Sequence, residues 1–180
     1  MQEQSKVVRF EQAVLPHLGA AYNLARWLTH NDQDAEDVVQ DAYLRAFRFF
    51  DGFRGGDSRA WLLAIVRNTS YTWLQQRRGP DLSTPFDEEL HGTACADLDP
   101  ERLAVQHADR QLLREALADL PAAYREVVVL RELEGLSYKE IAGIAAVPLG
   151  TVMSRLARAR KRLQYYLTDR LKKEGSNGLH

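Results

Sequence analysis

Apolar residues recur at steps of three and four along most of the chain, the spacing of helices that bury one face. The clearest case runs from Asp34 to Phe50, with an expected core face of Ala35, Val38, Val39, Ala42, Tyr43, Ala46, Phe49 and Phe50. Residues 8–29 form another helical stretch, which Pro16 interrupts. After Phe50 the pattern ends at Gly52, Gly55 and Gly56. Asp57 or Ser58 then caps a further helix.

The second half of the chain continues with helical patterns and ends in a compact motif. Residues 101–120 are amphipathic, and residues 122–134 follow with a predicted core face of Val127, Val128, Leu130 and Leu133. Ser137 and Glu140 have the spacing of a capping box, which begins a short helix over 138–145. A turn containing Pro148 and Gly150 leads into a long basic helix. This order is typical of a helix-turn-helix.

No segment alternates with the period of a half-buried strand, so the sequence predicts an all-α fold. Residues 79–100 contain three of the six prolines and two glycines without a regular apolar spacing, which indicates a linker. We therefore expect two small helical domains. They are an N-terminal domain over 1–79 and a helix-turn-helix domain over 102–171, joined by a flexible acidic linker over 80–101 and followed by a tail over 172–180.

Charge is unevenly distributed, although the 180 residues together have a formal net charge of −1. Residues 80–120 carry 3 basic and 10 acidic side chains, whereas residues 149–173 carry 8 basic side chains against Asp169 alone. Cys95 is the single cysteine, which excludes an internal disulfide, and no apolar run is long enough to span a membrane. We expect a cytoplasmic protein without a signal peptide and without direct membrane insertion.

The basic helix over 150–163 suits DNA, because the second helix of a helix-turn-helix fits the major groove. On one side of it lie the residues that would reach base edges: Met153, Ser154, Ala157 and Arg158. Those better placed for the phosphate backbone are Thr151, Arg155, Arg160, Lys161 and Arg162. Val152, Leu156 and Leu163 are left for the core. The alternative is a helical hairpin with a basic surface.

The string LPAAYREVVVLRELEGLSYKEIAGIAAVPLGTVMSRLARARKRL resembles the promoter-reading domain of bacterial RNA polymerase sigma factors of the extracytoplasmic-function group. Upstream, DAEDVVQDAYLRAF resembles the helix with which this family docks on core polymerase, and FRGGDSRAWLLAIVRN resembles the segment that captures and melts the −10 element. The matches follow the family's order and cover roughly residues 8–79 and 102–168.

The resemblance implies that core RNA polymerase is a partner. It assigns to this contact Asp34, Glu36, Asp37, Gln40, Asp41, Leu44 and Phe47. An acidic stripe against a basic coiled coil would give complementary charge, and the apolar residues would add buried area. The alternative is an ordinary solvated helix face.

The resemblance also implies that the first domain opens promoter DNA at the −10 element while the second reads the duplex −35 element. The residues assigned to the −10 element are Phe53, Arg54, Ser58, Arg59, Arg67, Asn68, Tyr71, Arg77 and Arg78. We prefer Asn68 as the base reader and expect Trp61 in the core. The family often has an aspartate where this chain has Thr72, and Tyr71 and Trp73 beside it either stack on bases or fill the core.

The resemblance further implies an anti-sigma factor as a regulatory partner, no cofactor and no catalytic activity. His91 and Cys95 fall one helical turn apart in the linker, but two ligands do not make a zinc site, so we expect no metal. One rival hypothesis is a stand-alone helix-turn-helix regulator, which gives no reason for the acidic stripe. The other is an enzyme with an added DNA-binding domain, for which residues 1–79 offer no convergent titratable groups.

Overall fold

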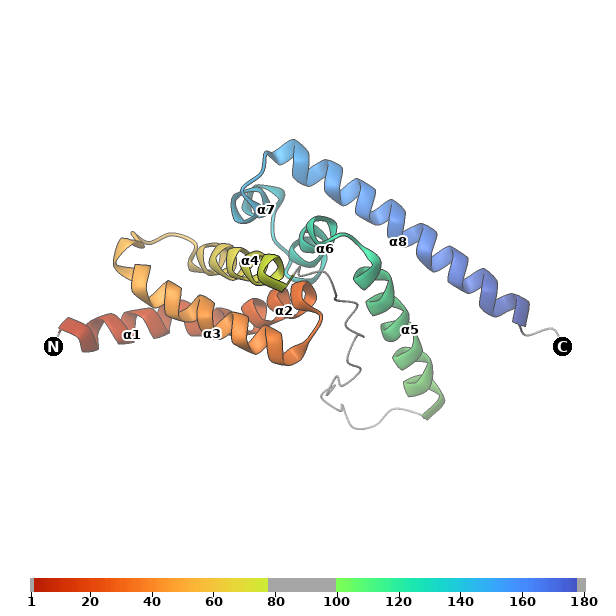
Figure 1. Cartoon of the computed structure of the whole chain (residues 1–180), viewed down its shortest axis with the longest axis horizontal. Helices are drawn as coiled ribbons and strands as arrows, with labels where there is room; N and C mark the ends of the chain where they lie inside the picture. The colour runs from red at the N-terminus through yellow and green to blue at the C-terminus, as the bar shows by residue number, and fades with distance from the viewer. Residues whose placement is uncertain (1, 78–99, 178–180) are drawn as a thin grey trace.

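The structure, a computed structural model, describes residues 2–77 and 100–177, and every regular element in these two ranges is helical (Figure 1). The N-terminal half contains α1 (Gln2–Val14), α2 (Leu18–Thr29), α3 (Asp32–Phe49) and α4 (Ser58–Arg77). The C-terminal half contains α5 (Pro100–Asp119), α6 (Ala122–Val128), α7 (Tyr138–Ala145) and α8 (Leu149–Asn177). The predicted all-α fold is confirmed. Pro16 separates α1 from α2 within a 3₁₀ turn, Leu15–His17.

In the N-terminal half, α2, α3 and α4 pack on one another because each presents an apolar stripe at helical spacing. The fully buried residues of this core include Leu24, Leu28, Leu62, Leu63 and Val66. Phe10 of α1 adds edge-on ring contacts with Tyr43, Phe47 and Phe50, at centroid separations of 6.1, 5.2 and 5.3 Å. The Asn31 side chain caps α3 by accepting the Asp34 N–H at 3.0 Å.

In the C-terminal half, α6, α7 and α8 enclose a second core made of Val127, Leu130, Ile141, Val152 and Leu156. The predicted capping box is confirmed. Ser137 Oγ accepts the Glu140 N–H at 3.2 Å, and the Glu140 carboxylate accepts the Ser137 N–H at 2.7 Å. α5 packs beside α8, where Arg170 donates to Glu115 at 2.6 Å.

Two residues predicted for the core lie in solvent. After α6 the chain makes a π-helical turn over Val129–Leu133, and its wider winding shifts the phase of the side chains. Leu133 is consequently 47% exposed. Phe49 is 63% exposed, because α3 ends there and the following 3₁₀ turn puts Phe50 into the core instead.

Two helices are longer than predicted. α1 begins at Gln2, and α8 continues beyond Leu163 to Asn177. Residues 164–174 contain no glycine or proline, and Lys173 pairs with Asp169 one turn earlier at 2.7 Å, so nothing local ends the helix. α8 therefore passes without a break from position 171 to position 172, where the sequence predicts the start of a tail.

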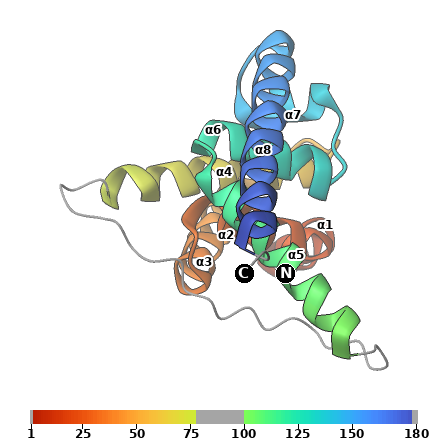
Figure 2. The same ribbon diagram turned by 90° about the vertical axis from the view of Figure 1, so that its right-hand side faces the viewer.

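The two halves pack against each other, α4 on α7 and α2 on α6, as Figures 1 and 2 show. Pro100 and Glu101, at the end of the predicted linker, belong to α5. The other linker positions, together with Arg78, His91 and Cys95, lie outside the described residues.

Candidate protein and nucleic-acid interfaces

The outer face of α3 carries most of the predicted docking residues in solvent. Those exposed are Glu36, Asp37, Gln40, Asp41, Leu44 and Phe47. Leu44 is 71% exposed, which is unusual for a leucine in the middle of a folded helix. Asp34 is half-buried and holds Arg77 of α4 through two contacts at 3.1 and 3.2 Å, whereas Asp41 is exposed and pairs with Arg45 of the same helix at 3.0 Å. Asp34 and Arg77, predicted for two different surfaces, thus bind each other.

A shallow pocket of about 160 Å³ lies between this acidic face and α4. Asp37 and Asp41 line it from α3, and Thr69, Thr72, Trp73 and Gln76 line it from α4. The Thr72 hydroxyl donates to the Asn68 carbonyl at 3.0 Å. An aspartate at position 72 would add a third carboxylate to this pocket, whereas threonine adds no charge.

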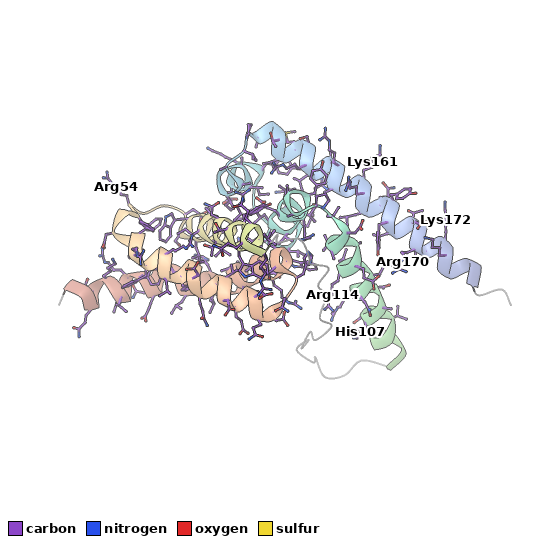
Figure 3. All side chains as sticks on the ribbon, in the orientation of Figure 1. Arg54, His107, Arg114, Lys161, Arg170 and Lys172 are labelled. Atoms are coloured by element: carbon purple, nitrogen blue, oxygen red, sulfur yellow. The ribbon has the colours of Figure 1, made fainter. Side chains whose placement is uncertain are left out.

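The loop between α3 and α4 places its aromatic residues in a cluster and its arginine in solvent. Phe53 stacks on Phe50 and lies 4.9 Å from Trp61, centroid to centroid, so both Phe53 and Trp61 are partly buried. Arg54 projects away from the protein (Figure 3). Gly55 and Gly56 follow at φ +88° and +101°, where only glycine is unstrained. Asp57 then caps α4 by accepting the Ala60 N–H at 3.1 Å.

Asn68 is exposed on α4, and the residues after it are turned inward. Thr69 and Ser70 are buried, and their hydroxyls donate to the carbonyls of Ile65 and Val66, one turn earlier, at 2.8 Å each. This satisfies both hydroxyls without any partner outside the helix.

Three residues predicted for −10 DNA contact the C-terminal half instead of solvent. Arg67 Nε donates to Glu126 at 3.0 Å, and the Tyr71 hydroxyl donates to the other oxygen of the same carboxylate. Arg59 donates to both the carboxylate and the carbonyl of Glu134, at 2.8 Å each. Burial and the Glu126 charge raise the pKa of Tyr71, which therefore stays a hydrogen-bond donor.

The helix-turn-helix exposes its second helix on one side only. The predicted base-facing residues Met153, Ser154, Ala157 and Arg158 all face solvent, as do Lys161 and Arg162. Val152, Leu156 and Ala159 are buried on the opposite side. Lys161 points away from α5, whereas Arg170 points toward it (Figure 3).

The remaining basic residues of this helix differ from one another. Arg160 is exposed but pairs with Glu132 at 2.6 Å. Thr151 and Arg155 are half-buried, and one terminal nitrogen of Arg155 has no hydrogen-bond partner among the described residues. In residues 2–77 and 100–177, no group of three metal-ligating side chains lies close enough to hold an ion.

Arg125, Glu126 and Glu134 were missed by the sequence reasoning. Arg125 is buried, and it donates to the carbonyls of Leu117, Ala118, Leu120 and Trp27. The sequence did contain a signal for two of them, because Arg125 and Glu126 lie within the apolar run from Ala122 to Leu130. Charged residues are rarely buried unless they are paired, so this position predicts partners elsewhere in the fold.

Two family models match this chain, one in each half. Sigma-70 region 2 matches residues 13–79, and Sigma-70 region 4 matches residues 110–163. The chain is 40% identical over 135 residues to the ECF RNA polymerase sigma-E factor of Escherichia coli K12, covering 71% of each protein. It is 34% identical over 168 residues to the ECF RNA polymerase sigma factor SigE of Mycolicibacterium smegmatis, covering 92% of this chain and 64% of that relative. The chain belongs to the extracytoplasmic-function (ECF) family of RNA polymerase sigma factors.

Two solved structures with similar folds are complexes with a second protein. One is the sigma factor RpoE in complex with the anti-sigma factor NepR from Bartonella quintana, with a TM-score of 0.72 and 32% identity over 89% of this chain and 97% of that one. Another is CnrH in complex with the cytosolic domain of CnrY, with a TM-score of 0.62 and 28% identity over 89% and 88% of the two chains.

Proposed function

We propose that this chain binds core RNA polymerase and directs initiation at promoters with defined −10 and −35 elements. The observation that carries the proposal is the pairing of regions 2 and 4 in one chain, each with an exposed face of suitable chemistry. We assign polymerase docking and −10 opening to residues 1–79, the linker to 80–101 and −35 recognition to 102–171, with 172–180 as a tail. Phosphodiester synthesis belongs to the polymerase, so we assign no catalysis to this chain.

The polymerase-binding face would be the exposed side of α3. Asp37 and Asp41 would meet basic residues of the polymerase, and Leu44 would supply the apolar contact that a specific interface needs. The pocket between α3 and α4 lies beside these two aspartates and is large enough for one side chain of the partner. Asp34 contributes less directly, because Arg77 already neutralises it.

Promoter DNA would contact two surfaces. On α8, Arg158 is exposed and no ion pair holds it in the described residues, so it is free to reach a base edge in the major groove. Lys161 and Arg162 follow on the same exposed side and suit phosphates. In region 2, Asn68 and Arg54 are the exposed residues that would bind the opened strand.

Transcription by purified core polymerase on a pool of promoter fragments tests this function directly. Discrete new start sites that depend on the protein are the expected result. A folded protein that neither binds core nor initiates, yet binds duplex promoter DNA, would instead be a stand-alone regulator.

Charge reversal tests the docking face. We expect the double variant Asp37→Lys, Asp41→Lys to lose most of its affinity for core polymerase, because two attractive contacts become repulsive. The matched control is Asp109→Lys with Asp119→Lys, the same charge change on exposed positions of α5. Equal core binding by the two double variants, measured by pull-down and titration, would remove α3 from the interface.

Truncation of one side chain tests −35 recognition. Arg158→Ala should weaken promoter binding by the holoenzyme by about 1–3 kcal/mol if the side chain contacts a base edge. Lys172→Ala, which removes a charge from the distal end of α8, is the control and should have little effect. An unchanged promoter preference in the Arg158 variant would exclude it from base reading.

We also propose an anti-sigma factor as a regulatory partner, since the similar sigma factor RpoE was solved in complex with the anti-sigma factor NepR. We place the protein in the cytoplasm, where core polymerase acts. Among the described helices, none is by itself long and apolar enough to cross a membrane, although α7 and residues 149–173 of α8 meet the criteria as a pair bent by 101°. Co-purification from host cells would identify the regulator.

A further inference from the structure

The contact between the two halves combines apolar packing with a few long-range polar bonds. Glu126 and Glu134 come from region 4, and their partners Arg59, Arg67 and Tyr71 come from α4. Asn23 of α2 adds a hydrogen bond to the second Glu134 oxygen at 2.7 Å. Both oxygens of each carboxylate are therefore bonded to donors of region 2.

Glu126 is fully buried, with 0% of its surface exposed. A carboxylate in this position requires donors, because leaving an ionised group unpaired in the interior is strongly unfavourable. Arg67 supplies a charged donor and Tyr71 a neutral one, and the guanidinium lies 4.2 Å from the centre of the Tyr71 ring. Glu126 is thus stable in its present site only while region 2 is packed against it.

Three of the four donors, Arg59, Arg67 and Tyr71, are among the residues assigned to the −10 element, so this step rests on the proposed function. Arginine binds carboxylate and phosphate with the same planar fork of N–H groups. One set of donors cannot satisfy both acceptors at the same time. Region 4 and the promoter strand consequently compete for Arg59 and Arg67.

We propose that Glu126 and Glu134 form an intramolecular latch, in which region 4 occupies the −10 surface of region 2 and keeps the free protein from engaging promoter DNA. The latch occludes Arg59, Arg67 and Tyr71, and it leaves Asn68 and the docking face of α3 exposed. Core polymerase therefore has access to α3 before the two regions separate. Separation then frees the donors of α4 for DNA.

The balance of energies suits a switch. Burying ion pairs carries a large desolvation cost that offsets most of their attraction, so these two carboxylates add little net stability to the latched form. A latch that lowers the competent fraction about tenfold weakens the apparent affinity for DNA by the same factor.

Distance measurement on the free full-length protein tests the latch without any assumption about function. Spin labels would be placed at Gln33 on α3 and Tyr165 on α8, both exposed and outside the contact, in a Cys95→Ser background. We expect one narrow distance distribution for this protein and a broad, longer one for the variant Glu126→Gln, Glu134→Gln. The control is Glu132→Gln, which frees Arg160 within region 4 but breaks no bond between the halves, and it should keep the narrow distribution. A broad distribution in the unmodified background, or an unchanged one in the double variant, would overturn the latch.

A reversible cross-link tests the inhibitory role. This test does not require the double variant Glu126→Gln, Glu134→Gln to fold. Asn23→Cys and Glu134→Cys, in the same background, would be joined by a short bismaleimide that contains a reducible disulfide. We expect the cross-linked protein to lose at least about tenfold in initiation with core polymerase, and reduction of the linker to restore it. Full activity while cross-linked would refute the inhibition. If the unmodified protein directs no initiation, the proposed function itself fails, and the inhibitory role falls with it; the label distances still report whether the halves are closed.

Discussion

Replacement of Arg125 by methionine gives the most direct test of how the two halves stabilise each other. Arg125 lies in α6 and is 5% exposed. Three of its four acceptors, Leu117, Ala118 and Leu120, are carbonyls at the end of α5, and the fourth, Trp27, is a carbonyl in the last turn of α2. The last carbonyls of a helix have no partner within the helix, so one guanidinium caps two helix ends.

The magnitude follows from these four bonds, which measure 2.9 Å to Leu117, 3.0 Å to Ala118, 2.6 Å to Leu120 and 3.1 Å to Trp27. A hydrogen bond contributes about 0.5–1.5 kcal/mol net, and methionine of similar length removes all four bonds, although the Leu117 carbonyl still accepts the Leu120 N–H at 3.2 Å. Burial disfavours the charged form of Arg125 and lowers its pKa to about 10. Replacing the cation by methionine relieves this desolvation cost, which offsets part of the loss. We expect Arg125→Met to lower the free energy of unfolding by about 3 kcal/mol.

Urea unfolding with two probes resolves where the loss is felt. The chain has three tryptophans, Trp27, Trp61 and Trp73, and all of them lie in the N-terminal half. Tryptophan fluorescence therefore follows region 2 alone, whereas circular dichroism at 222 nm follows the helices of both halves. Because Arg125 binds the Trp27 carbonyl across the interface, we expect the fluorescence midpoint to fall together with the dichroism midpoint.

Arg125→Lys is the matched control. Lysine keeps the charge, but its three donors sit on one atom and cannot span both helix ends, so we expect about half the loss. A loss below about 0.5 kcal/mol for Arg125→Met would refute the capping role. A shift in dichroism without any shift in fluorescence would show that the bond to Trp27 does not couple the halves.

Three further predictions concern single positions. Acidification from pH 7 to 4.5 should destabilise the fold through His30: burial and the nearby Arg125 hold its pKa at about 4, so the unfolded chain binds a proton that the folded chain excludes. Between pH 6.5 and 4 the free energy of unfolding falls by up to about 2 kcal/mol, a figure reduced because His30 is partly exposed to solvent. Urea unfolding of His30→Asn at several pH values measures this contribution, and the variant should depend less on pH. Ser137→Ala should lower the free energy of unfolding by about 1 kcal/mol through loss of the N-cap, and an unchanged urea midpoint would contradict this. Gly135→Ala should also lower the free energy of unfolding by about 1 kcal/mol, because alanine is strained at φ +68° although no atom lies within 4 Å of the added carbon. Gly143→Ala, in α7 with equal space, is the control and should be neutral or stabilising; thermal unfolding of both variants measures the difference.

Local pattern in the sequence predicted most of the helices and their exposed faces. The acidic stripe on α3, the capping box at Ser137 and the buried side of α8 all depend on residues within one or two turns, which periodicity and capping rules describe. The same rules were wrong at Phe49, the last residue of α3, and at Leu133, where a π-helical turn changes the phase of the side chains. The 3₁₀ turn after Phe49 contains Gly52, whereas the π-helical turn over Val129–Leu133 contains neither glycine nor proline.

Tertiary structure alone decided which charges are free and which are paired. Sequence reasoning treated Arg59, Arg67 and Arg77 as available cations, and the fold pairs them with Glu134, Glu126 and Asp34. The bonds between the halves join residues 55 to 111 positions apart, so no window along the chain contains both partners. Periodicity records only which side of a helix is apolar. Which polar group meets another across two packed helices depends on their crossing and register, and these exist only once the chain has folded.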